Sequence, residues 1–266
     1  MLSPESPFTP WILGLAALLL VALLAIRAIR KDRTEYQHFK TLTDSADRQR
    51  MYRKWLRASF LGFGGASVVI LLLGWQFVPK LLATVGDWAI ISAYRTWFAT
   101  TGGVGIGVVV GLIVGFLLLT AVAALAARRD KDVPSIGDIQ AMLPRNRQEL
   151  VLTGLMSINA GVVEELLMRL ALPALLFGAT GNAALAIVLS ILLFGALHVY
   201  QGVWGVLGTT VIGAVMMALY LVTGSILVPM DVHACIDLRS LVVIPVLVYR
   251  VHNKSANDAE EIPSAK

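Results

Sequence analysis

The chain has 266 residues, of which 57% are hydrophobic and only 15% are charged, and its mean hydropathy is +0.76. A soluble domain of this size needs more polar surface, so the composition excludes an ordinary soluble enzyme. Because Cys235 is the only cysteine, an intramolecular disulfide and a cysteine-rich metal site are excluded as well. The net charge of +5 lies beside apolar runs, where it favours contact with anionic lipid over nucleic acid.

Apolar runs close to membrane-spanning length recur along the chain. They are continuous rather than alternating, which predicts helices, and a helix satisfies its own backbone hydrogen bonds in lipid. We therefore expect an all-α fold, a polytopic transmembrane helical bundle of about seven spans. The expected spans are 11–26, 60–78, 102–127, 150–177, 183–200, 203–222 and 226–249.

The distribution of basic residues predicts the topology. Residues 1–10 contain no lysine or arginine, whereas a basic cluster follows the first expected span. By the positive-inside rule, this asymmetry places the N-terminus outside and the C-terminus in the cytoplasm. We expect an integral protein of the bacterial cell membrane, in which 27–57 is a basic cytoplasmic linker.

Ionisable residues inside apolar helices are costly and point to function by default. Glu164 and Glu165 are adjacent, so their side chains point about 100° apart on a helix. Glu165 and Arg169 are four residues apart in the favourable acid-first order, and we expect them to pair. Glu164 is then left without a local partner. We assign Glu165 and Arg169 to orientation and Glu164 to chemistry; the alternative is a structural ion pair with a spare carboxylate.

Two further pairs have the same helical spacing. Phe194 and His198 are four residues apart, which places the two rings on one helix face. His233 and Asp237 are also four apart and can act on one point, a spacing that helical metal sites use. Taken singly, His198 also fits a satisfied core histidine, and His233 with Asp237 also fits a hydrogen bond that joins two helices.

The three patterns occur in order on three apolar helices, and in this they resemble the CAAX prenyl endopeptidase and bacteriocin-processing family, also called the Abi family. The family pattern is Glu-Glu-x-x-x-Arg, then Phe-x-x-x-His, then His-x-x-x-Asn or Asp, and the resemblance covers about 150–251. It implies peptide-bond hydrolysis within the membrane. It implies that Glu164 and His198 activate the attacking water and that Phe194 is an orienting residue of the site. It also implies that His233 and Asp237 stabilise the oxyanion or act as ligands.

The charge of this site leaves two mechanisms open. Three carboxylates against one guanidinium make the site negative, and uncompensated charge in an apolar interior is costly. A divalent cation such as Zn²⁺ could balance it, with His198, His233, Asp237 and Glu164 as candidate ligands. Otherwise a carboxylate or a histidine takes up a proton. The family resemblance favours the glutamate-dependent mechanism, which needs no cofactor, while the aspartate at position 237 keeps the metal-dependent alternative open.

The expected organisation is a membrane region at 1–147 with three spans, a CAAX-protease-like catalytic helical core at 148–252 and a disordered tail at 253–266. The expected partners are a peptide or protein substrate in or at the membrane and the lipid bilayer. No nucleic-acid motif is present, and the sequence fixes no oligomeric state. The rival functions are a membrane scaffold or chaperone that retains the fold, and a transporter with a buried ion pathway.

Two expectations concern structure alone. Asp231 follows Pro229 near the start of the last span, which predicts a helix-capping role. Four glycines in 102–127 recur every fourth residue and so share one helix face, which predicts close packing against another helix. They are Gly103, Gly107, Gly111 and Gly115.

Overall fold

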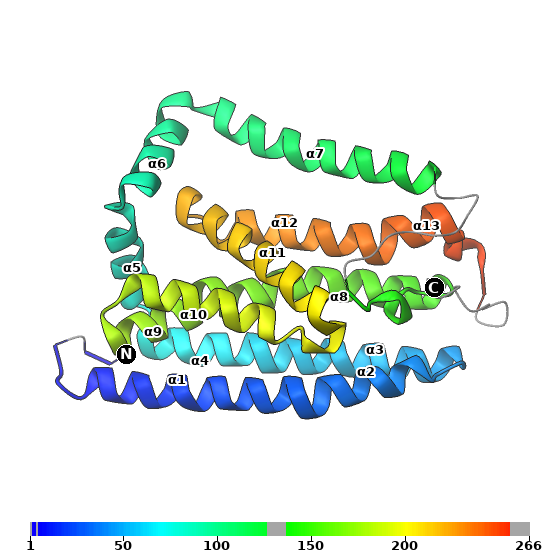
Figure 1. Cartoon of the computed structure of the whole chain (residues 1–266), viewed down its shortest axis with the longest axis horizontal. Coiled ribbons are helices and arrows are strands. Elements are labelled where there is room, and N and C mark those ends of the chain that lie inside the picture. Colours follow the sequence, from blue (N-terminus) through cyan, green and yellow to red (C-terminus); the bar gives the residue numbers. More distant parts are fainter. Residues whose placement is uncertain (1, 4, 127–136, 256–266) are drawn as a thin grey trace.

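In the computed structural model, the chain is described at residues 2–3, 5–126 and 137–255. Throughout these ranges the regular elements are helices, and none is a strand. Figure 1 shows the long helices running roughly along one direction, with shorter helices crossing one end. The expected all-α bundle is confirmed.

The N-terminal part forms an antiparallel helical hairpin (Figure 1). Its outgoing helix consists of α1 (Thr9–Ile26), a π-helical turn at Arg27–Asp32 and α2 (Arg33–Lys40). Its returning helix consists of α3 (Ser45–Ser59), a π-helical turn at Phe60–Gly64 and α4 (Gly65–Gly74). The Asp44 side chain caps α3 by accepting hydrogen bonds from the N–H groups of Ala46 and Asp47.

The segment 27–57, expected from its composition to be a basic linker, is helical apart from the reversal near 41–44. The aromatic side chains of Tyr36, Phe39 and Tyr52 are at most 1% exposed. The rings of Phe39 and Tyr52 lie edge to face with their centroids 5.0 Å apart. The hairpin therefore has an aromatic interior between charged outer faces.

Three helices connect the hairpin to the far side of the bundle. They are α5 (Phe77–Gly86), α6 (Ala89–Thr101) and α7 (Gly103–Ala126). Figure 1 shows α5 and α6 at one end of the molecule and α7 running back along the side away from α1. A Cβ added at any of the four evenly spaced glycines of α7 would meet no described atom within 4 Å. Within the described residues, the predicted close packing of these glycines against another helix is therefore not found, although α7 contacts α6 and α13.

The central helix carries the Glu-Glu-x-x-x-Arg motif. It consists of α8 (Arg147–Glu165), a π-helical turn at Leu166–Ala171 and α9 (Leu172–Thr180). Its first half packs against α3 and α12, and its second half packs against α1 and α5. The helix ends at Gly181, which has the left-handed φ of +67°. Asn182 then caps α10 (Ala183–Ala196), which folds back along α9.

The remaining helices complete the bundle. They are α11 (Gly202–Thr223), α12 (Leu227–Leu238) and α13 (Ile244–Tyr249), with a π-helical turn at Arg239–Val243 and short 3₁₀ helices at Gln140–Met142, Val199–Gln201 and Val251–Asn253. The carbonyl of Lys254 accepts a hydrogen bond from the N–H of Arg147, 3.2 Å away. Most of the predicted tail, 256–266, lies outside the described residues.

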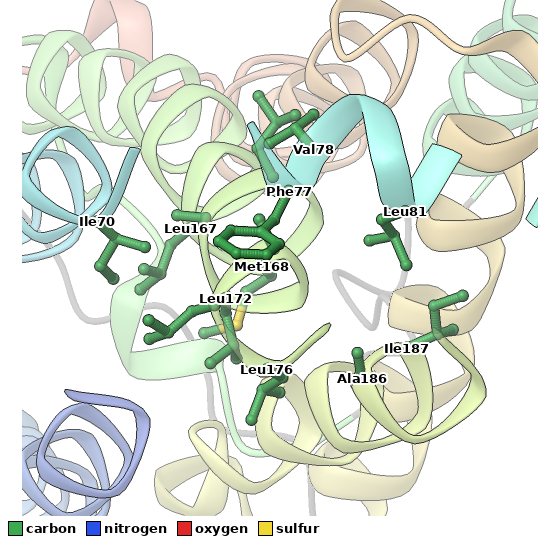
Figure 2. Close-up of a cluster of buried hydrophobic side chains, with 14 of the residues drawn as sticks. Ile70, Phe77, Val78, Leu81, Leu167, Met168, Leu172, Leu176, Ala186 and Ile187 are labelled. Carbon is green, nitrogen blue, oxygen red and sulfur yellow. The ribbon is translucent and has the colours of Figure 1, made fainter. Parts of the chain in front are cut away.

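Buried apolar side chains fix the central helix immediately after the motif (Figure 2). Leu167, Met168 and Leu172 are at most 1% exposed. They belong to one cluster with Ile70 of α4 and Phe77 of α5. In lipid, helices associate through such close van der Waals packing, so this cluster holds the motif in place.

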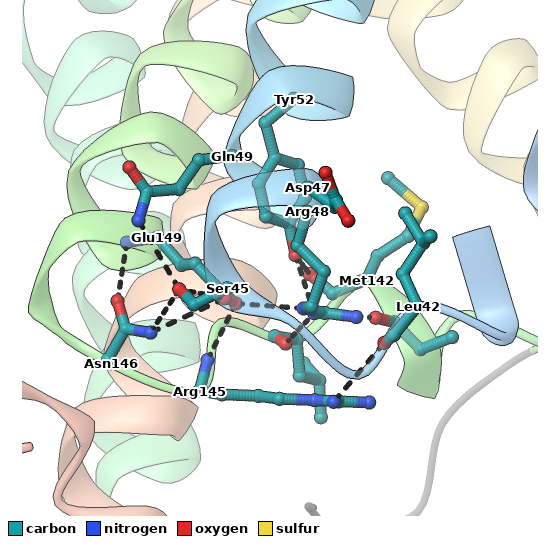
Figure 3. Close-up of polar contacts among 12 residues, drawn as sticks. Leu42, Ser45, Asp47, Arg48, Gln49, Tyr52, Met142, Arg145, Asn146 and Glu149 are labelled. Atoms are coloured by element: carbon teal, nitrogen blue, oxygen red, sulfur yellow. Dashed lines mark hydrogen bonds and ion pairs between the residues drawn. The ribbon is translucent and has the colours of Figure 1, made fainter. Parts of the chain in front are cut away.

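A buried polar network fixes the other end of the same helix (Figure 3). Arg48 of α3 and Glu149 of α8 are both 0% exposed, and their Nε and Oε2 atoms are 3.1 Å apart. The Arg48 guanidinium also donates to the carbonyls of Ala141 and Leu143. Asn146 caps α8 by accepting the N–H of Glu149. The hairpin is thereby tied to the start of the helix that carries the motif.

The protein is an integral membrane protein. In the part of the chain that the structure describes, four helical stretches are long and apolar enough to cross a membrane: 9–40, 45–74, 199–223 and 227–249. Large apolar side chains on the outer faces of the bundle, such as Leu19, Leu72 and Leu119, are more than half exposed and fit contact with lipid. The count of about seven spans remains a prediction.

Candidate active site

The predicted pair between Glu165 and Arg169 is present. Glu165 Oε2 and Arg169 Nε are 2.9 Å apart, and the two side chains are 0% and 1% exposed. The π-helical turn begins directly after Glu165, so the pair spans the junction between α8 and this turn. The other carboxylate oxygen, Oε1, lies 2.7 Å from His233 Nδ1 on α12. Glu165 therefore connects the first motif to the third.

A glycine makes this connection possible. Gly161 lies one turn before Glu165, and a Cβ there would lie 2.8 Å from the backbone nitrogen of Ala234 and 2.9 Å from the carbonyl oxygen of Met230. Such distances are shorter than carbon contacts allow, so only glycine lets α8 and α12 approach this closely. The approach brings the carboxylate of Glu165 to the ring of His233.

The other nitrogen of His233 faces Asp237. The Nε2 and Oδ2 atoms are 3.7 Å apart, which is too long for a hydrogen bond. A small movement of either side chain would bring the two atoms within hydrogen-bonding distance. His233 is buried, whereas the Asp237 side chain is 31% exposed. The ring of His233 thus lies between two carboxylates, one buried and one open to the surroundings.

The ring of Phe194 packs against the charged residues of the site. Its side chain is 3% exposed, and the Arg169 guanidinium carbon lies 4.5 Å from its ring centroid. The same ring contacts both histidines, with centroid separations of 4.9 Å to His198 and 6.0 Å to His233. One aromatic ring therefore touches residues of all three motifs.

His198 lies beyond the end of α10, in the turn that leads to the 3₁₀ helix Val199–Gln201. Its Nδ1 is 2.8 Å from the carbonyl oxygen of Phe194. A carbonyl only accepts, so Nδ1 must carry the hydrogen, and in the neutral ring Nε2 then presents a lone pair. This nitrogen can accept a hydrogen bond from water.

Glu164 is half-buried and has no hydrogen bond or ion pair with any described residue. Its carboxylate interacts electrostatically with both histidines of the site, His198 and His233. The sequence expectation that Glu164 lacks a local partner therefore agrees with the geometry. The three motifs lie together in the structure, and the Glu164 carboxylate forms no hydrogen bond or ion pair with a described residue there.

Comparison with known protein families identifies the segment that holds this site. Residues 146–239 match the family model described as Type II CAAX prenyl endopeptidase Rce1-like. This segment belongs to the CAAX protease family. No curated protein and no solved structure matches the chain. The match begins at the cap of α8 and ends two residues after Asp237, so it includes every motif residue.

The candidate metal ligands of the CAAX-protease segment do not form a three-donor group. Across the described ranges, no three His, Cys, Asp or Glu side chains are grouped so that they could hold one ion. The Nδ1 atoms of His198 and His233 face a carbonyl and a carboxylate, which leaves Nε2 of each ring for another partner. Metal-binding histidines have such a partner on their second nitrogen as well, so these two contacts fit either mechanism.

Two features of the CAAX-protease segment differ from the sequence-based expectation or were missed by it. Asp231 does not cap α12, because the helix begins at Leu227 and its cap position is Ile226. Pro229 lies within the first turn of the helix, where a missing N–H is tolerated. Tyr200 lies beside His198, with ring centroids 6.0 Å apart. An aromatic residue two positions after the histidine is the only sequence signal for that contact.

Proposed function

We propose that the chain is an intramembrane endopeptidase that hydrolyses peptide bonds of membrane-associated proteins or peptides with a water activated by Glu164. One observation carries the proposal: three helices bring the motif residues together, and of the three motif carboxylates Glu164 alone makes no hydrogen bond or ion pair with a described residue. A buried or half-buried acid without a structural partner is available for chemistry.

Glu164 and His198 together provide two acceptors for one water. The water donates one hydrogen to the Glu164 carboxylate and the other to Nε2 of His198, whose lone pair is available because Nδ1–H bonds Phe194. Glu164 removes a proton as the water oxygen attacks the peptide carbonyl carbon. The same carboxyl group then gives that proton to the leaving nitrogen as the C–N bond breaks.

In this proposal, His233 stabilises the oxyanion of the tetrahedral intermediate. Its Nδ1 bonds the Glu165 carboxylate, so Nε2 is the nitrogen that can donate to substrate. A ring that donates through both nitrogens carries a positive charge, and Glu165 and Asp237 lie on its two sides to balance it. Arg169 acts through Glu165, which it holds in place.

The test compares membrane proteomes. A deletion strain is complemented with the wild-type chain, with Glu164→Gln or with Asp231→Asn, and uncleaved precursors are quantified. Asp231 is the matched control, since it is an exposed carboxylate of α12 for which no hydrogen bond or ion pair with a described residue is present. Precursors should accumulate with Glu164→Gln and should not with Asp231→Asn. Normal processing by Glu164→Gln would instead favour a scaffold, chaperone or transporter.

A further inference from the structure

The turn that carries His198 is held by contacts within the CAAX-protease segment and by residues outside it. Within the turn, Tyr200 lies against His198 at 6.0 Å with an interplanar angle of 31°. The amide of Gln201 donates to the Tyr200 hydroxyl at 3.0 Å, which fixes the phenol ring within the turn. The position of Tyr200 therefore affects the position of the His198 ring.

Tyr36 of the N-terminal hairpin contacts this turn in two ways. Its ring lies edge-on to that of Tyr200, with centroids 5.4 Å apart. Its hydroxyl donates to the carbonyl oxygen of Asp138 at 2.6 Å, and the N–H of Asp138 donates to the carbonyl oxygen of Gln201 at 2.9 Å. Tyr36 is 1% exposed, so its ring and its hydroxyl are shielded from water.

The backbone at Gly137 and Asp138, which lies between Tyr36 and the turn, is itself fixed. Gly137 has a φ of +79°, and a Cβ there would lie 2.8 Å from the Cα of Gly205 at the start of α11. This backbone can thus lie directly on α11 only with glycine at position 137. Lys40, one turn after Tyr36, forms an ion pair with the Asp138 side chain.

We propose that Tyr36 is a positioning residue that sets the orientation of His198 through Tyr200 and through the Asp138–Gln201 hydrogen bond. The inference rests on the proposed function, in which His198 holds the attacking water. The hairpin is then part of the catalytic unit, although it lies outside the matched family segment. Removing the Tyr36 hydroxyl leaves the Asp138 carbonyl without that donor and frees the turn, while the ring of Phe preserves the packing.

Histidine NMR tests the proposal without a substrate. The chain has only 4 histidines, so ¹⁵N-histidine labelling in detergent gives a simple imidazole spectrum, in which His198→Gln assigns the His198 signals. Wild type should show His198 as a single tautomer with hydrogen on Nδ1. Tyr36→Phe should shift or broaden these signals and leave those of His233 unchanged, and Tyr36→Leu should change them further.

Tyr52→Phe is the matched control. Tyr52 lies in the same hairpin, is 0% exposed and donates to a backbone carbonyl, that of Met142, but it belongs to the Arg48 network and does not touch the His198 turn. Its variant should leave the His198 signals in place. Unchanged His198 signals in a folded Tyr36→Phe protein would overturn the proposal, as would equal changes in both variants.

Kinetics provide the second readout, with a substrate peptide identified by the proteome comparison. Tyr36→Phe should lower kcat about 10-fold and leave KM within about twofold, because a misplaced histidine affects the chemical step more than binding. Tyr52→Phe should retain wild-type kcat. A Tyr36→Phe enzyme with wild-type kcat would contradict the proposal. An active Glu164→Gln protein would contradict the proposed function instead, and the NMR result would still decide the role of Tyr36.

Discussion

Glu165 Oε1 lies 2.7 Å from His233 Nδ1, although the two residues are 68 positions apart in the chain. The same carboxylate uses its second oxygen to pair with Arg169 at 2.9 Å. One buried acid thus balances the Arg169 charge, fixes which nitrogen of His233 faces Asp237 and joins α8 to α12. In the proposed mechanism, such a residue contributes to stability and to activity together.

Removing either member of the buried pair should destabilise the protein. Glu165→Ala leaves the Arg169 guanidinium buried without its carboxylate. Arg169→Ala leaves the Glu165 carboxylate buried without its guanidinium. Each should reduce the free energy of unfolding by about 3–5 kcal/mol, because an uncompensated charge remains in the interior. Thermal unfolding in detergent measures the effect. The exposed ion pair of Asp47 and Arg50 is the control, and Arg50→Ala should cost less than about 1 kcal/mol. Equal melting of all three variants and wild type would contradict the prediction.

Glu164→Gln should lower the rate of peptide cleavage without lowering the stability of the protein. The amide has nearly the same shape but cannot take a proton from water, so cleavage should fall by at least about 100-fold. No hydrogen bond or ion pair with a described residue is lost, so the melting temperature should stay close to wild type. Peptide cleavage by purified protein is measured beside unfolding. Activity equal to wild type would remove Glu164 from the role of base.

Gly161→Ala should push α8 and α12 apart. The added methyl group would meet the Ala234 and Met230 backbones at less than 3.0 Å, and backbone cannot move aside as a flexible side chain can. We expect a loss of about 1–3 kcal/mol and a fall in activity, since Glu165 moves away from His233.

Gly154→Ala is the control for this change. It lies two turns earlier in α8, and its Cβ would meet only the side chain of Val242 at an ordinary 3.5 Å. Alanine favours a helix over glycine by about 1 kcal/mol, so this variant should be unchanged or stabilised. Equal effects of the two substitutions on melting and cleavage would show that the close approach at Gly161 is unimportant.

The sequence predicted the local geometry of the site and missed the contacts that join it. The pair of Glu165 and Arg169 follows from helical spacing alone, because i and i+4 side chains must be neighbours. The contact of Glu165 with His233 depends instead on how closely two helices pack, and this is decided by Gly161 and the residues facing it. Spacing within one helix carries no information about that distance.

The N-terminal hairpin is a second part of the fold whose packing the sequence did not predict. Charged residues dominate 27–57, so composition suggested a linker, whereas Tyr36, Phe39 and Tyr52 fall on the inner faces of two helices and are buried. Periodicity in these short helices is interrupted by a π-helical turn and a chain reversal, which weakens the sequence signal. The turn at His198 was equally hard to place, because α10 ends at Ala196 within a continuous apolar run.

Asp237 distinguishes the two mechanisms that the sequence leaves open. If the working enzyme binds a metal ion through this residue, Asp237→Asn should weaken binding, because a neutral amide is a poorer ligand than a carboxylate. Activity should then fall and recover partly with added Zn²⁺. In the metal-free mechanism, which we favour, the Asn amide can donate to the oxyanion as an ionised Asp cannot, so activity should hold or rise.

The measurement is peptide cleavage by purified wild-type and Asp237→Asn protein, each with and without a chelator, together with metal analysis of the active protein. Asp231→Asn serves as control, because Asp231 lies on the same helix but outside the motif. An Asp237→Asn enzyme that stays active and resists the chelator would eliminate metal ligation at this position. A variant that is inactive and is rescued by metal would eliminate the metal-free glutamate mechanism, since Glu164 and His198 alone would then be insufficient to activate the water.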